Sequence, residues 1–324
     1  MASDADRHPA DEIRIGVSAC LLGAKVRFDG QHKLHQWVTG TLGQFVTFVP
    51  ACPEVDIGLG TPRETIRIQQ EGERQRLVAP KSGADHTATM EHYARAKCQE
   101  LAAMDLSGYI LKKDSPTCGM ERVRVYGASG VAQRTGSGFF ARALLHRFPL
   151  LPVEEEGRLN DPWLRENFLE RVFAYRRVRT LFASTWSVGD LVAFHTREKF
   201  LLLAHEPKGY TALGKLVASA KGRSRPALAA EYEGQFMASL ARIATVKKHC
   251  NVLQHMAGHF KREATAADRQ ELERIIEDYR ASLVPLVVPL TLIRHFVRRY
   301  GAPYLAGQTY LEPSPKELML RNHV

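Results

Sequence analysis

The chain has 324 residues, of which 44% are hydrophobic and 25% are charged, and its formal net charge is +10. This composition is that of an ordinary globular protein, and because no run approaches the ~20 apolar residues of a membrane helix, it excludes a helical membrane protein. Five cysteines without a close pair argue against a disulfide framework and predict a reducing, cytoplasmic environment. The polar residues 1–8 do not resemble a secretory signal, which agrees with that expectation.

Strand-like and helix-like segments alternate in the first half of the chain. Strands are predicted over residues 13–19, 45–50 and 108–111, helices over 32–42, 87–104 and behind the glycine turn at 135–138, and a polar hairpin over 63–79. The strand-like runs are apolar enough to be buried in a parallel sheet. The first half is therefore predicted to be an α/β domain with a mainly parallel sheet and Rossmann-like layers.

Helical spacing of apolar residues dominates the second half, which is predicted to be all-α. Asn160-Asp-Pro-Trp has the pattern of a capped helix start and opens an amphipathic helix expected over residues 163–182. Further helices are predicted over residues 191–205, 211–219, 227–257, 265–284 and 289–299. The expected organisation is a domain over residues 1–165, a connecting helix over 166–186 and a helical domain over 187–324.

Positive charge belongs to the second half of the chain. Residues 1–160 carry 20 Lys and Arg against 19 Asp and Glu, whereas residues 161–324 carry 25 against 16, a net charge of +9. Such a bias favours a half that binds a polyanion. Arginine-rich helices with solvated faces would give the same totals.

Three cysteines each follow a strand-like run and lie in a turn. Because ligands of parallel sheets bind beyond the carboxyl ends of the strands, Cys20, Cys52 and Cys118 are predicted to converge on one crevice. Three thiolates without a fourth suit an iron–sulfur cluster with one open iron. Buried structural cysteines, another metal or a thiol nucleophile remain as alternatives.

Polar residues beside these cysteines are candidates for chemistry. Glu54, two residues after Cys52, is placed to act as an acid/base, unless it is a solvated loop carboxylate. The hydroxyl of Ser115 could hydrogen-bond a heterocycle, or it could form a turn before a proline. Asp29 could orient substrate or a water, or it could be a turn residue before a glycine.

Three motifs together resemble the thiouracil desulfidase family, over roughly residues 13–165. They are Ser18-Ala-Cys-Leu-Leu-Gly, Val49-Pro-Ala-Cys-Pro-Glu and Asp114-Ser-Pro-Thr-Cys-Gly. Cys98 matches no motif, and we interpret it as a packing thiol.

The resemblance implies an α/β domain that holds a 4Fe–4S cluster by three cysteines, here Cys20, Cys52 and Cys118, with one open iron. It also implies that Glu54 is the catalytic acid/base and Ser115 the active-site serine. The implied reaction is hydrolysis of a carbon–sulfur bond, in which a water assisted by Glu54 attacks the ring carbon and sulfide departs.

The second half resembles the YbgA-like helical domain fused to desulfidases that act on 4-thiouridine in tRNA, where it is thought to bind the RNA. The resemblance covers segments that begin at Phe194, Tyr210, Asn251 and Tyr304. Basic residues that could contact phosphate, or else are solvated side chains, are Arg197, Lys199, Lys247, Lys248, Lys261, Arg262, Arg294, Arg298 and Arg299. Tyr210 and Tyr310 are either core residues or stacking partners for RNA bases.

The sequence therefore predicts a cytoplasmic, cluster-dependent desulfidase that converts 4-thiouridine in tRNA to uridine, with no membrane partner. One alternative is a desulfidase of free thiouracil or another thiolated small molecule. The other is an iron–sulfur sensor that binds nucleic acid without turnover, although a placed Glu54 and Ser115 favour an enzyme. No feature of the sequence fixes the number of subunits.

Overall fold

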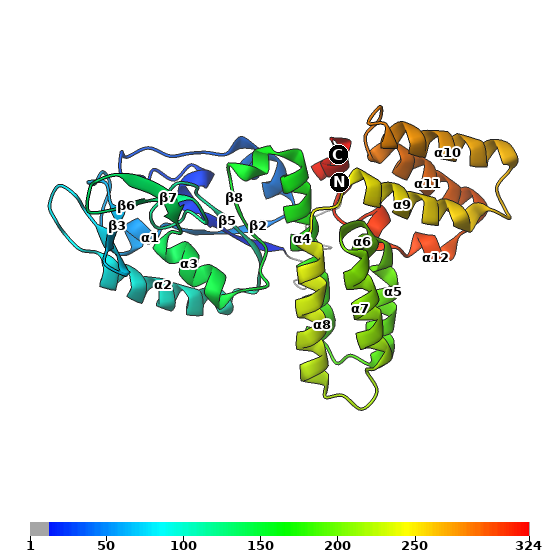
Figure 1. The fold of residues 1–324 in the computed structure, drawn as a ribbon, viewed down its shortest axis with the longest axis horizontal. Helices are drawn as coiled ribbons and strands as arrows, with labels where there is room; N and C mark the ends of the chain where they lie inside the picture. The colour runs from blue at the N-terminus through cyan, green and yellow to red at the C-terminus, as the bar shows by residue number, and fades with distance from the viewer. Residues whose placement is uncertain (1–12, 324) are drawn as a thin grey trace. The chain divides into compact units, whose positions relative to one another are not determined.

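The computed structural model describes residues 13–323, so the expectation for residues 1–8 lies outside the described part. The chain divides between Asn160 and Asp161 into two compact units (Figure 1). The first unit combines sheets and helices, and the second is mostly helical. Both observations confirm the predicted fold class.

A four-stranded parallel sheet forms the centre of the first unit. Its order is β2-β1-β5-β8, with β1 paired to both β2 and β5. The strands are β1 (Arg14–Ser18), β2 (Thr47–Ala51), β5 (Leu106–Leu111) and β8 (Val153–Glu155). The three predicted strands are confirmed, whereas β8, with three residues, is too short for a periodic pattern.

Strand β2 differs from the buried strand predicted for it. It lies at the edge of the sheet, and most of its residues are exposed or half-buried. Pro50 is tolerated there because an edge strand has no neighbour that needs its missing N–H. By contrast, β5 is buried along its whole length.

A second sheet of four strands covers residues that were predicted only in part. Its order is β4-β3-β6-β7, in which β3 pairs antiparallel with β4 and parallel with β6. The strands are β3 (Arg67–Glu71), β4 (Arg74–Val78), β6 (Val123–Tyr126) and β7 (Ala132–Gly136). The predicted hairpin over 63–79 is therefore confirmed, and β6 and β7 are additions.

Helices α2 and α3 pack against each other in the first unit (Figure 1). The α-helices of this unit are α1 (Pro53–Asp56), α2 (Thr87–Ala102) and α3 (Phe139–Arg147). The ring of Phe140 in α3 lies 5.9 Å from that of Tyr109 in β5. Gly16 in β1 leaves room for Tyr109, since a Cβ there would lie 2.2 Å from that ring. Cys98 is buried on α2, as expected of a packing thiol.

The helix predicted over residues 32–42 is wrong for its first half. Residues 32–35 have no regular structure, and a π-helix (Trp37–Thr41) and a 3-10 helix (Leu42–Gln44) follow. Two threonines, a valine and a glycine in this stretch oppose a regular α-helix. A further 3-10 helix, Ala19–Leu22, comes directly after β1.

The second unit consists of nine α-helices among the residues that the structure describes. They are α4 (Pro162–Ala183), α5 (Val188–Arg197), α6 (Lys199–His205), α7 (Pro207–Ala218), α8 (Arg225–Leu240), α9 (Val246–Ala257), α10 (Ala266–Arg280), α11 (Val287–Tyr300) and α12 (Pro303–Ala306). Short 3-10 helices of this unit cover Gly258–Phe260, Thr309–Leu311, Lys316–Leu318 and Leu320–Asn322, and one more, Arg158–Asn160, ends the first unit.

Two predicted helices are interrupted. The one over 191–205 breaks at Glu198, a fully buried carboxylate that pairs with Arg177 at 2.8 Å. The one over 227–257 breaks at 241–245, where the Thr245 side chain accepts a hydrogen bond from the Lys248 N–H and starts α9. Such caps satisfy N–H groups that have no partner inside the helix.

A buried charged cluster ties the last residues to α4. The Arg321 guanidinium lies 2.8 Å from Glu170, whose other oxygen is 2.9 Å from His205. Burial raises the pKa of Glu166 well above its usual range, with the nearby Glu170 charge adding to the effect. No helix between residues 13 and 323 combines the length and hydropathy that crossing a bilayer requires.

Candidate functional site

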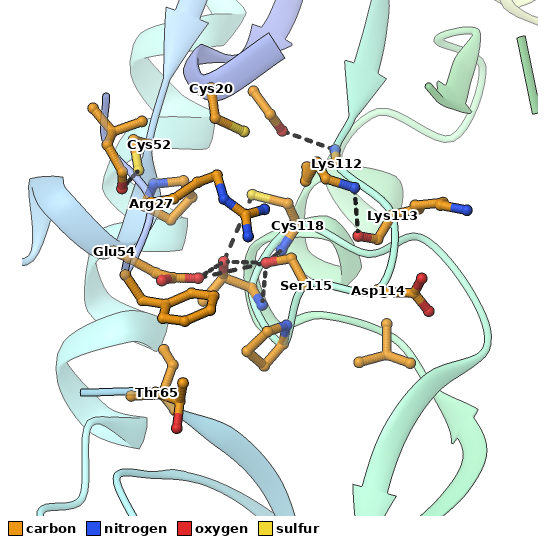
Figure 2. Close-up of a pocket in the computed structure, with 18 of the residues that line it drawn as sticks. Cys20, Arg27, Cys52, Glu54, Thr65, Lys112, Lys113, Asp114, Ser115 and Cys118 are labelled. Atoms are coloured by element: carbon orange, nitrogen blue, oxygen red, sulfur yellow. Dashed lines mark hydrogen bonds between the residues drawn. The ribbon is translucent and has the colours of Figure 1, made fainter. Parts of the chain in front are cut away.

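A cavity of about 480 Å³ lies at the carboxyl ends of β1, β2 and β5. Cys20, Cys52, Cys118, Glu54 and Ser115 all line it. Figure 2 shows the three thiols around the same space, with Glu54 and Ser115 beneath Cys118 in this view. The predicted convergence on one crevice is therefore observed, while the roles of these residues stay predictions.

Local structure places each thiol. Cys20 lies in the 3-10 helix that follows β1, and Cys52 is the first residue after β2. Cys118 ends the turn that begins at Ser115, beyond β5. Because β2, β1 and β5 are neighbours, the three segments leave the sheet at the same edge.

Burial sets the protonation of the thiols. It raises the pKa of Cys20 to about 11 and that of Cys118 to about 12, and it also raises the pKa of Cys52. Lys112 and Arg27 act in the opposite direction and lower the pKa of Cys20. All three thiols are free of disulfides. They are therefore neutral in the metal-free protein and must lose protons to bind a metal.

The three thiols supply sulfur donors to the cavity. Within residues 13–323, no group of three or more His, Cys, Asp or Glu side chains could hold one metal ion. A single zinc needs thiolates at about 2.3 Å from one centre. In an iron–sulfur cluster the ligands are Cys thiolates, and three cysteines line this one cavity. Cys20, Cys52 and Cys118 would hold such a group.

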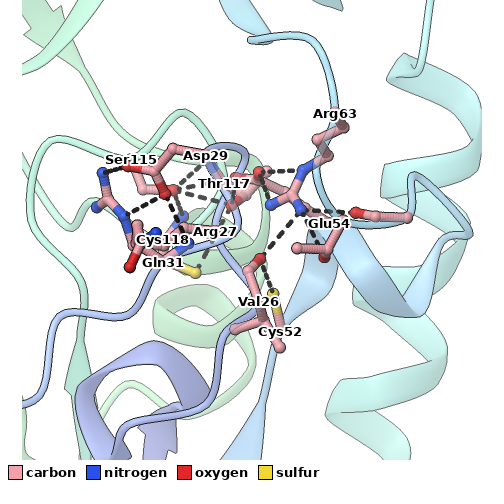
Figure 3. A network of polar contacts seen from close by, with 12 residues as sticks. Val26, Arg27, Asp29, Gln31, Cys52, Glu54, Arg63, Ser115, Thr117 and Cys118 are labelled. Carbon is pink, nitrogen blue, oxygen red and sulfur yellow. Dashed lines mark hydrogen bonds and ion pairs between the residues drawn. The ribbon is translucent and has the colours of Figure 1, made fainter.

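Glu54 is clamped by charge on one oxygen and by hydroxyls on the other. Arg63 donates to Oε2 through Nη2 at 2.6 Å and Nε at 3.1 Å. Thr117 donates to Oε1 at 2.9 Å, and Ser115 lies 3.5 Å from the same oxygen. Figure 3 shows this network beside the Cys118 thiol. The carboxylate is thus fixed, with Oε1 facing the hydroxyl cluster.

Arg63 also connects Glu54 to the cysteine loops. Its side chain is only 6% exposed, and its Nη1 donates to the carbonyls of Gly60 at 2.8 Å and Val26 at 3.0 Å. The Cys52 thiol lies 3.7 Å from the same Val26 oxygen. One guanidinium therefore orders the carboxylate and the loop behind a thiol.

Ser115 both forms a turn and faces the cavity. Its hydroxyl oxygen accepts from the backbone N–H groups of Thr117 at 3.2 Å and Cys118 at 3.1 Å. The hydroxyl proton is left for Glu54, for Thr117 or for a bound molecule. Turn formation and a polar contact in the site are compatible at this residue.

Asp29 lies beside the cavity and does not belong to its wall. Its carboxylate accepts from the Arg27 side chain at 3.2 Å and from the Gln31 N–H at 3.1 Å. The bond from Arg27 lowers the pKa of Asp29 below its usual value. Its predicted contact with substrate or water stays a prediction, and its observed partner is Arg27.

Sequence reasoning did not identify Arg63 and Thr117 as site residues. Thr117 stands within the third cysteine motif, so its position was a usable signal. Arg63 precedes β3 in a segment that was interpreted only as a polar hairpin, and nothing in its local pattern indicates a partner at Glu54.

The Glu54–Arg63 pair is expected to stabilise the fold as well as the site. The side chains of Arg63 and Glu54 are only 6% and 14% exposed, so removing one partner leaves the other charge poorly solvated. Arg63→Gln should therefore lower the free energy of unfolding of the metal-free protein by about 3 kcal/mol in urea titrations. Arg76→Gln is the control, since Arg76 also forms ion pairs, with Glu71 and Asp85, but is exposed, and the substitution should change the stability little. Equal effects of the two substitutions would contradict this assignment.

The fold and the cavity define an α/β protein with three converging thiols and a clamped carboxylate at the edge of a parallel sheet. Residues 15–156 match the family described as 2-thiouracil desulfurase, and residues 199–315 match a family described as a protein of unknown function, DUF1722. The chain belongs to the 2-thiouracil desulfurase family in its first unit and carries a DUF1722 domain in its second. The matched range contains all three cysteine motifs.

Two curated relatives and one solved structure are similar to parts of the chain. Uncharacterized protein YbgA of Escherichia coli K12 is 31% identical over 158 residues, which cover 48% of this chain and 94% of that protein. Uncharacterized protein YbbK of Bacillus subtilis 168 is 33% identical over 153 residues, covering 45% and 97%. The solved structure, described as the 4Fe-4S-dependent thiouracil desulfidase TudS, is 35% identical, covers 46% of this chain and 94% of that chain, and has a TM-score of 0.38.

Proposed function

We propose that the protein is an iron–sulfur-dependent desulfidase that converts 4-thiouridine in tRNA to uridine. The observation that carries the desulfidase part is the meeting of Cys20, Cys52 and Cys118 with Glu54 and Ser115 in one cavity. The net reaction exchanges a thiocarbonyl and water for a carbonyl and hydrogen sulfide, so it needs no external oxidant or reductant. A 4Fe–4S cluster on the three thiolates, with one iron open, would supply Lewis-acid polarisation of the thiocarbonyl sulfur.

The protein's own groups provide proton transfer and orientation. Glu54 Oε1 takes the proton of the attacking water, while Arg63 holds Oε2 and keeps the carboxylate aimed. The Ser115 hydroxyl donates to a polar atom of the heterocycle. Cys20 and Cys118 are buried, and the lower local dielectric beside them strengthens electrostatic interactions at that end of the cavity.

Support for an RNA substrate comes from the second unit, which carries the net charge of +9. Tyr304 is 39% exposed, and its ring stacks on His259 with 5.2 Å between centroids. The Lys199 ammonium lies 5.8 Å from the centroid of the Tyr304 ring. The pKa of His259 is lowered mainly by burial and further by the nearby Lys199 and His255. Exposed aromatic rings beside cations are the surfaces on which RNA bases stack.

Several of the basic and aromatic residues predicted to contact RNA instead contact other residues of the second unit. Tyr310 is fully buried and hydrogen-bonded to His249 at 2.7 Å, so it is a core residue and not a stacking partner for RNA. Tyr210 is stacked on His195. Arg294 donates to the Leu311 carbonyl, Lys248 to the His205 carbonyl, and Arg299 is paired with Asp268.

Turnover of thiolated tRNA and of free thiouracil by the intact, cluster-loaded chain tests the proposal. Tyr304→Ala should raise KM for the tRNA about tenfold, the size of one lost stacking contact, and leave free thiouracil turnover unchanged. Leu283→Ala is the control, since Leu283 is also exposed in the second unit. Efficient turnover of free thiouracil with none of the tRNA would favour the free base, which the family's description also favours. No turnover of either by iron-loaded protein would favour a sensor.

A further inference from the structure

Phe28 exposes its ring in the wall of the catalytic cavity. It lines the cavity and is 40% exposed, whereas Cys20 and Cys118 in the same wall are buried. Contact between an exposed aromatic ring and water is unfavourable, so a ligand that covers the ring gains free energy of binding. Ligand cavities are commonly lined by such rings, which supply area and orientation to a planar ligand.

The backbone under this ring is held in place. The Phe28 carbonyl accepts from the Arg63 N–H at 2.9 Å, and a turn closes behind it through Gly30 N–H to the Arg27 carbonyl at 3.0 Å. Gly30 has φ +73°, a conformation that favours glycine. Because Arg63 also clamps Glu54, the ring and the carboxylate share one anchor.

Arg27 lies over the ring and is itself oriented. Its guanidinium carbon is 5.3 Å from the Phe28 ring centroid, and two hydrogen bonds of 3.2 Å tie it to Asp29. Figure 3 shows the Arg27–Asp29 pair and the bond from Gln31. A cation over one face restrains the ring and leaves the rest of its exposed area to the cavity.

We propose that Phe28 is the stacking surface for the heterocyclic ring of the substrate, and that Asp29 acts through Arg27 as a positioning residue. The ligand class is a planar pyrimidine, either free or as a base turned out of RNA, since both must place the ring in the same cavity. The inference rests on the proposed desulfidase function. Asp29 lies outside the cavity wall, so it would act on the substrate only through Arg27, which it holds by two hydrogen bonds.

The test compares variants of the full-length protein. Phe28→Ala should raise KM for thiolated pyrimidine about tenfold with a smaller change in kcat, because stacking holds the ring before and during reaction. Phe28→Leu keeps the apolar bulk but has no ring face, so its KM should be raised as in Phe28→Ala. Phe28→Trp keeps a ring face, so its KM should stay close to that of the wild type. Asp29→Asn should raise KM less than Phe28→Ala. Leu34→Ala, a 46% exposed residue in a neighbouring segment, is the control.

A second measurement is independent of turnover. Calorimetric titration of the cluster-free protein with uracil, the product ring, should show about tenfold weaker binding for Phe28→Ala and Phe28→Leu than for the wild type. Unchanged KM and uracil affinity in both variants would overturn the inference. So would a fall in kcat or iron content alone, which would indicate a structural role. Wild-type protein that turns over no thiolated pyrimidine would instead refute the proposed function.

Discussion

Glu54→Gln is expected to lower kcat for desulfidation by at least about 100-fold, the usual loss when a general acid/base is removed. Glutamine keeps the shape of the side chain but cannot take a proton from water. Arg63 retains the carbonyls of Val26 and Gly60 as acceptors after the substitution, so the loop behind Cys52 should stay ordered. The measurement is single-turnover desulfidation together with counts of bound iron and sulfide.

The control for this prediction is Glu54→Asp, which keeps the charge but shortens the reach by one carbon. It should retain more activity than Gln at equal iron content. A Gln variant that keeps the full rate with an intact cluster would show that Glu54 transfers no proton in the reaction.

Cys118→Ser is expected to remove bound iron and reduce desulfidation to background. Cys118 is one of three thiols in the cavity, and a serine hydroxyl is too weak an acid to replace a thiolate ligand. Cys98→Ser is the matched control, because Cys98 is equally buried but lies on α2 outside the cavity.

Cys118→Ser should lower the iron and sulfide counts, the visible absorption of the cluster and the turnover. Cys98→Ser should leave all of these unchanged. Cys20→Ser and Cys52→Ser should behave like Cys118→Ser. Retention of stoichiometric iron by any one of these three would exclude that cysteine as a ligand.

Much of the first unit could be predicted because its central strands are short, largely apolar runs that end in turns. Leu106–Leu111 is buried at every position, as expected of a strand inside a parallel sheet. Strand β8 has three residues, and most of β7 is exposed, so neither leaves a periodic signal. Helix α8 ends at Leu240, and α9 starts after a break with a hydrogen bond to the Thr245 side chain, a local contact that apolar spacing does not reveal.

The candidate site was predictable where chemistry follows directly from a strand end. Cys20 and Cys52 are of this kind, and Glu54 follows Cys52 by two residues. The pairing of Glu54 with Arg63 depends on how the loop between them folds back, and no local pattern in the sequence indicates that path. Asp29 illustrates the opposite case, since its short-range bond to Arg27 competes with any direct contact in the cavity.

The order β2-β1-β5 has a consequence for how such proteins diverge. Adjacent strands lie about 4.8 Å apart, a spacing that backbone pairing fixes, so the framework beneath the three thiols is set by the sheet. Phe28 and Arg63 come from connecting segments that can change in length and composition without disturbing that framework. Changes in these connecting segments would therefore alter which ring the cavity accepts and leave the strand ends that carry the three thiols in place.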